Sequence, residues 1–144
     1  MKNTFWKRER IEIMTALALF NYVFLGAEYL FDNMMAFQTD SGGVVLAQSY
    51  VLGSSPVGFL LFGVLDGKMR ERAKKAGSAG AGVLAAVCLW GIQVHQSYGS
   101  TLAAGLILYV LLGIAGSLVH YRVACRYGME EHLAETVGVS YATG

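Results

Sequence analysis

Long apolar runs separated by short polar connections dominate this chain of 144 residues. Four runs, at residues 13–37, 44–65, 76–94 and 102–123, come close to or exceed the roughly 20 helical residues that cross the apolar core of a bilayer. None alternates apolar and polar positions with a period of two, which argues against membrane strands. Because backbone groups in lipid must be paired within their own segment, the pattern predicts an all-α polytopic membrane protein with four transmembrane helices.

Composition agrees with this prediction. Hydrophobic residues make up 55% of the chain and charged residues only 15%, against about 25% charged residues in a typical soluble domain. We therefore expect a single transmembrane domain over residues 1–144, with the lipid bilayer as its surroundings. After the fourth run a polar link leads into a short C-terminal segment, in which a further helix would begin near His132.

All eleven Lys and Arg residues fall on one side of a chain that crosses the membrane four times. The connections at residues 38–43 and 95–101 contain none of them. The positive-inside rule makes the basic side cytoplasmic, so we expect a multi-pass protein of the cytoplasmic (inner) membrane with both termini inside. Residues 68–75 then form a cytoplasmic loop that fixes orientation and binds no nucleic acid. The basic residues are Lys2, Lys7, Arg8, Arg10, Lys68, Arg70, Arg72, Lys74, Lys75, Arg122 and Arg126.

The first run carries a polar stripe. Asn21, Glu28 and Asp32 fall within about 40° of one another around a helix. An ionisable group at this depth costs at least ~2.5 kcal/mol if it faces lipid, so the stripe should face other helices or a wet cavity. Glu28 is a candidate proton carrier, because desolvation disfavours the charged form of a carboxyl group. The alternative is a carboxyl that only holds neighbouring helices together.

The second run offers polar partners for this stripe. Because the first two helices run antiparallel, Gln48 should lie near Asp32 in depth, and Ser54 and Ser55 near Glu28. With Asn21 these residues form the predicted proton or substrate face. Small residues at i, i+4 in the third run, such as Gly82 and Ala86, and glycines such as Gly113 in the fourth run predict close helix packing.

The order of these features resembles the beginning of a major facilitator superfamily protein. The resemblance rests on the polar first helix "FNYVFLGAEYLFDN", the glycine-rich second helix "YVLGSSPVGFLLFGVLDG" and the basic loop that follows. The family carries a G-x-x-x-D-R-x-G-R signature in this loop, for which Gly63, Asp66, Arg70 and Arg72 are the candidates. The spacing from Gly63 to Asp66 is one residue short, and "GKM" replaces the region where the signature has Arg and Gly.

The resemblance implies a function for a larger assembly. Members of the family pair six helices with six and bind a small molecule between the halves. We therefore expect this chain to be the N-terminal portion of a transporter and to have no transport activity as a monomer. Further helices of the parent protein, or other membrane chains, would complete it, and the complete transporter would be coupled to protons. Two alternatives remain: the sensor or assembly region of a LuxR-type regulator, whose membrane part is similar, and a small membrane subunit that does not transport. The sequence has no catalytic motif, metal-ligand spacing or haem-ligand pair, so we expect no enzyme activity, metal or cofactor.

Overall fold

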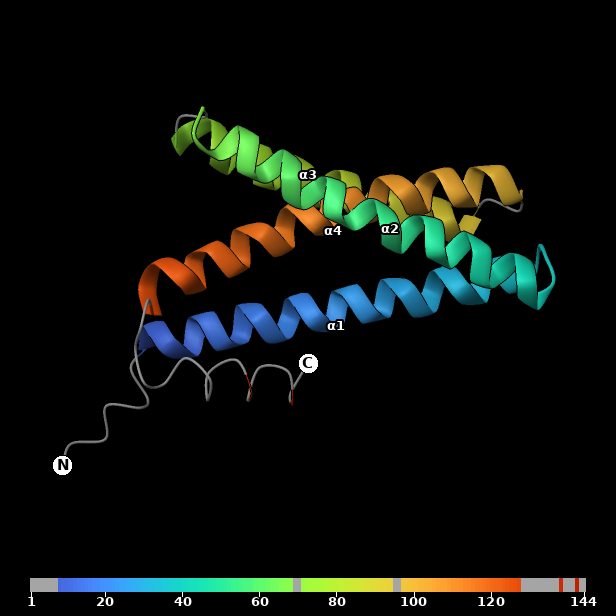
Figure 1. Ribbon diagram of the computed structural model, residues 1–144, viewed down its shortest axis with the longest axis horizontal. Coiled ribbons are helices and arrows are strands. Elements are labelled where there is room, and N and C mark those ends of the chain that lie inside the picture. The colour runs from blue at the N-terminus through green and yellow to red at the C-terminus, as the bar shows by residue number, and fades with distance from the viewer. Residues whose placement is uncertain (1–7, 69–70, 95–96, 128–137, 139–141, 143–144) are drawn as a thin grey trace. The chain divides into compact units, whose positions relative to one another are not determined.

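The structure, a computed structural model, describes residues 8–68, 71–94 and 97–127 together with Gly138 and Ala142. These residues form four α-helices and, in the described ranges, no strand (Figure 1). The predicted all-α fold class is confirmed. The predicted C-terminal segment lies almost entirely outside the described residues. The helices are α1 (Arg8–Ala36), α2 (Ser41–Asp66), α3 (Glu71–Val94) and α4 (Tyr98–Tyr127).

Three of the four described helices have the length of membrane-spanning helices. They contain apolar segments long enough to span a bilayer, namely Ile11–Ala36, Ser41–Leu65 and Tyr98–Cys125, and α3 contains the shorter apolar segment Ala79–Val94. Large apolar side chains lie exposed along all four helices, as expected for a surface whose solvent is lipid rather than water. Examples are Tyr22, Leu25, Tyr29, Val45, Leu60, Val64, Val83, Trp90 and Ile107. The chain is a helical membrane protein.

The basic segment before the third span differs from its prediction. We expected a loop through Lys75, but α3 begins at Glu71, so Arg72, Lys74 and Lys75 belong to its first turns. Glu, Arg, Ala and Lys are all strong helix formers, and a carboxylate is favourable at a helix N-terminus. The helix therefore continues beyond its apolar part, and the connection from α2 shortens to residues 67–70.

The helix α4 also begins earlier than predicted, at Tyr98 rather than at residue 102. Ser97 precedes it and acts as its cap, since its Oγ accepts a hydrogen bond from the Ser100 backbone amide at 3.4 Å and lies 2.6 Å from the Ser100 hydroxyl. Serine is a favoured residue at this position because its oxygen pairs an amide that the helix leaves open.

The chain divides into two compact units. The first unit comprises residues 1–25 and 118–144, and its core contains Ile13, Leu17 and Val123 with Val119 packed against them. In the same unit the Phe20 ring meets the His120 ring edge to face, with centroids 6.2 Å apart.

The second unit comprises residues 26–117 and thus the end of α1, all of α2 and α3, and most of α4. Its helices α2 and α4 cross backbone to backbone at Gly58 and Gly113. A Cβ at Gly58 would collide with the Val110 carbonyl and would lie 2.9 Å from the Gly113 Cα, so only glycine permits this approach. The predicted row in α3 behaves differently, because a Cβ at Gly82 would meet no atom of the described chain within 4 Å.

A short connection at residues 37–40 makes α1 and α2 antiparallel neighbours. The backbone amides of Gln38 and Thr39 close the end of α1 by donating to the Met35 carbonyl at 2.8 and 3.1 Å. Asp40 then caps α2, since its Oδ1 accepts a hydrogen bond from the Gly43 amide at 3.0 Å. This connection fixes which residues of α1 and α2 lie at the same level.

Candidate functional site

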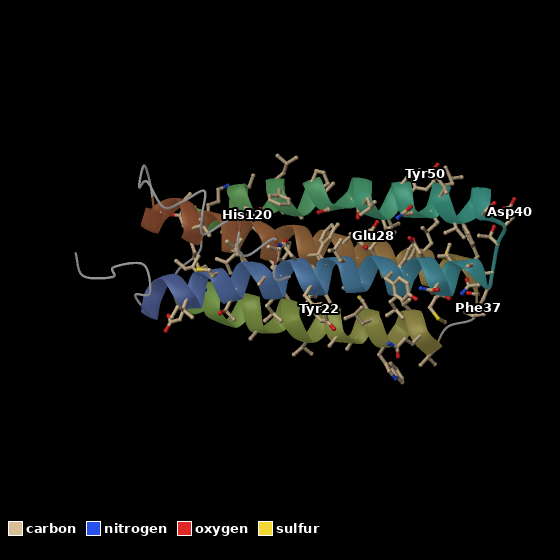
Figure 2. All side chains as sticks on the ribbon, turned by 90° about the horizontal axis from the view of Figure 1, so that it is seen from below. Tyr22, Glu28, Phe37, Asp40, Tyr50 and His120 are labelled. Atoms are coloured by element: carbon tan, nitrogen blue, oxygen red, sulfur yellow. The ribbon has the colours of Figure 1, made fainter. Side chains whose placement is uncertain are left out.

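A group of polar side chains in the described part of the second unit joins α1 to α2. The Nε2 atom of Gln48 donates hydrogen bonds to Oε1 of Glu28 at 2.7 Å and to Oδ2 of Asp32 at 3.0 Å. One amide group thus serves two carboxylates, and we call Glu28, Asp32 and Gln48 the carboxylate–amide cluster. Figure 2 shows Glu28 on the side of α1 that faces α2, whereas Tyr50 stands on the outer side of α2.

The helix geometry explains why these three residues meet. Glu28 and Asp32 are four positions apart and therefore lie one above the other on the same face of α1. They precede the end of α1 by about 12 and 6 Å, and Gln48 follows the start of α2 by about 10 Å. Because the two helices are antiparallel, the amide of Gln48 is level with the gap between the two carboxylates.

The cluster is half-buried among apolar side chains. Ala27 and Phe31 of α1 and Ala47 and Val51 of α2, which lie within three positions of the polar residues in sequence, are all buried. From α4, the fully buried Tyr109 lies close enough to both carboxylates to interact with them electrostatically. In such surroundings hydrogen bonds are electrostatically stronger than in water, and an unmatched polar group is correspondingly costly.

Asp32 is only partly satisfied within the described residues. Its Oδ2 accepts the hydrogen bond from Gln48, but its Oδ1 is buried with no hydrogen-bond partner there. An ionised carboxylate can only accept hydrogen bonds, whereas a protonated one carries an O–H donor. The pair of carboxylates therefore has the chemistry to hold and release a proton.

A second polar contact ties the α1–α2 connection to α4. Nε2 of Gln38 donates a hydrogen bond to Oγ1 of Thr101 at 3.0 Å, and Thr101 is fully buried. Sequence reasoning missed this pair, because both residues lie in or next to short polar connections where water would satisfy them equally well. No pattern in the sequence marks them.

The other residues of the predicted face have different surroundings. The hydroxyl of Ser54, which we expected at the level of Glu28, donates to the Val51 carbonyl at 2.6 Å and to the Leu106 carbonyl of α4 at 3.3 Å. Ser55 is buried where its own carbonyl approaches Gly113. Both serines thus belong to the contact between α2 and α4.

Asn21, the remaining residue of the predicted stripe, belongs to the first unit. Its Nδ2 is buried and has no hydrogen-bond partner among the described residues. The structure therefore brings Glu28, Asp32 and Gln48 of the second unit together, and Asn21 belongs to the first unit.

The candidate loop signature is only partly described. Gly63 lies exposed on α2, with open space where a Cβ would be. Asp66 is the last residue of α2 and Arg72 the second residue of α3, but their side chains lie outside the described part of the chain, as does the whole of Arg70.

In the ranges that the structure describes, no group of three or more His, Cys, Asp and Glu residues could hold a metal ion. Comparisons of the chain with protein-family models, curated proteins and solved structures found no match. The carboxylate–amide cluster is therefore the principal guide to function.

Proposed function

We propose that this chain forms part of a proton-coupled membrane transporter for a small molecule, and that Glu28 and Asp32 carry the coupling proton. The observation that supports this proposal is the shared donor, since the Gln48 amide bonds both carboxylates at 2.7 and 3.0 Å. The resemblance to the beginning of a major facilitator protein agrees with it. In that arrangement further helices, from the parent protein or from other membrane chains, complete the substrate site.

Protonation of the cluster would act on the link between α1 and α2. With both carboxylates ionised, each accepts a hydrogen bond from Gln48, and the two negative charges repel each other across the amide. A proton on either carboxyl removes one charge and turns one oxygen into a donor. The hydrogen bonds that join the two helices then differ between the loaded and the unloaded state, which is the differential interaction that coupling requires.

Infrared difference spectroscopy of the chain in lipid nanodiscs, recorded between acidic and alkaline pH, tests the proposal. We expect a carboxyl C=O band from the cluster that Glu28→Gln and Asp32→Asn each shift or remove. Glu12→Gln is the matched control, because Glu12 is an exposed carboxylate of the same helix. Its spectrum should retain the band.

A spectrum in which neither Glu28→Gln nor Asp32→Asn changes any carboxyl band would overturn the proposal. If the two variants instead weaken only the association or thermal stability of the protein, the cluster is an assembly contact. That result would favour the sensor region of a regulator or a small subunit that does not transport.

A further inference from the structure

The first unit contains a pocket that the carboxylate–amide cluster does not involve. It has a volume of about 400 Å³ and opens between the start of α1 and the end of α4. This volume falls within the range of small-molecule sites, roughly 300–1,000 Å³. Its lining combines mostly apolar side chains with one acid and one base. The lining residues are Glu12, Ile13, Ala16, Val119, Tyr121, Arg122 and Cys125.

The pocket lies where two membrane helices leave the apolar core. Glu12 is the second residue of the apolar segment Ile11–Ala36, and Arg122 is the fourth from the end of Tyr98–Cys125. The 26 residues of the first segment are about 39 Å long, about 9 Å more than the ~30 Å apolar core. The start of the first segment and the end of the second therefore reach the headgroup layer, where an exposed aromatic residue such as Tyr121 is typical.

We propose that this pocket binds a membrane phospholipid of the phosphatidylethanolamine class. The headgroup of such a lipid carries a phosphate and a free ammonium, which match the two charged side chains of the lining. The guanidinium of Arg122 donates hydrogen bonds to the phosphate, and the carboxylate of Glu12 accepts them from the ammonium. The acyl chains lie along the apolar wall formed by Ile13, Ala16 and Val119.

The acid in the lining distinguishes this lipid from the other common headgroups. Phosphatidylglycerol offers a phosphate but no cation, so Glu12 repels it. Phosphatidylcholine has the same charges, but its quaternary ammonium has no N–H group to donate to the Glu12 carboxylate. Arg122 alone would favour any phosphate, and only the combination of Arg122 with Glu12 selects a headgroup with a free ammonium.

Native mass spectrometry of the full chain, released from nanodiscs of phosphatidylcholine mixed with either phosphatidylethanolamine or phosphatidylglycerol, tests the inference. We expect retained phosphatidylethanolamine to exceed the other two lipids. Glu12→Gln and Arg122→Gln should each lower the preference about two- to fivefold, the range of a partly exposed ion pair. Lys68→Gln is the control, because Lys68 is an exposed cation outside the pocket, and should leave the preference unchanged.

Preferential retention of phosphatidylglycerol, or a phosphatidylethanolamine preference that survives both pocket variants, would overturn the inference. Circular dichroism of each variant shows whether its helices are intact. If Arg122→Gln loses helical content, Arg122→Lys provides the test, because lysine keeps the charge but lacks the planar set of donors of the guanidinium. We expect Arg122→Lys to weaken retention of phosphatidylethanolamine without reversing the preference for this lipid. The test does not involve the carboxylate–amide cluster, so the inference about the lipid would remain valid if the proposed proton function failed.

Discussion

The side-chain amide of Gln48 donates one hydrogen bond to each of two carboxylates. Removing the amide leaves Glu28 and Asp32, one turn apart on the same face of α1, without their shared donor. A buried acceptor that loses its partner costs its full desolvation penalty, about 1–3 kcal/mol and more when it is charged. Gln48 should therefore contribute more to the free energy of unfolding than a glutamine that donates a single hydrogen bond.

We expect Gln48→Leu to lower the free energy of unfolding by about 1–3 kcal/mol. Combining it with Glu28→Gln and Asp32→Asn should recover part of this loss, because the triple variant leaves no unpaired charge. Gln93→Leu is the matched control, since Gln93 is an exposed glutamine of α3. Thermal unfolding in nanodiscs measures each effect. Equal midpoints for Gln48→Leu and Gln93→Leu would show that the hydrogen bonds of Gln48 contribute nothing.

The sequence allowed part of this cluster to be predicted. Two carboxylates in an apolar run are rare enough to attract attention, and the antiparallel course of the first two helices placed Gln48 near Asp32 in depth. The partners of Ser54 could not be predicted in the same way. A serine hydroxyl is short enough to reach backbone carbonyls of its own or a neighbouring helix, and only the helix packing decides which of these it bonds.

Among the described elements, α2 and α4 approach each other closely where they cross at Gly58 and Gly113. Two helices come this near only where both lack side chains, and the contact then gains from dispersion between the backbones. The same helix α2 also carries glycines with open space around them, such as Gly53. Glycine content alone therefore does not mark the contact.

We expect Gly58→Ala to destabilise the second unit by about 1–3 kcal/mol, because its methyl group would force the two backbones apart. Gly53→Ala provides the control on the same helix. It should be neutral or slightly stabilising, since alanine favours a helix by up to about 1 kcal/mol over glycine and its Cβ meets nothing within 4 Å. The thermal unfolding midpoints of Gly58→Ala and Gly53→Ala test this prediction. Equal midpoints would contradict a close backbone contact at Gly58.

Helix ends were less predictable than helix existence. Apolar runs mark the part of a helix that lies in lipid, but α3 continues backward through charged residues with high helix propensity to Glu71. The glycines of α3 and α4 looked equivalent in the sequence, although Gly113 makes a contact and Gly82 makes none within the described chain. Small residues permit close packing, and the choice of partner depends on the whole set of helices.

For the whole molecule, the arrangement of charge along the chain supports one orientation. The short connections α1–α2 and α3–α4 contain neither Lys nor Arg, whereas the segments on the other side hold all eleven. The shift of Arg72, Lys74 and Lys75 from a loop onto the first turns of α3 does not alter this count. The rule concerns bases near the ends of the spans, whether they lie in a loop or on a helix.

We therefore expect both termini to lie in the cytoplasm of the cell that makes this protein. Reporter fusions after Lys75 and after Gly144 should read as inside, and fusions near Ser41 and Tyr98 as outside. Replacing the five bases between Lys68 and Lys75 with Gln should produce a mixed orientation, because the bias then rests on the N-terminal bases and on Arg122 and Arg126. Replacing the uncharged Gln93 with Asn serves as the control and should leave every reporter unchanged. An outside signal after Gly144 together with an inside signal after Lys75 would mean that an odd number of segments crosses the membrane between these two positions. It would contradict the prediction that α3 and α4 alone cross the membrane there.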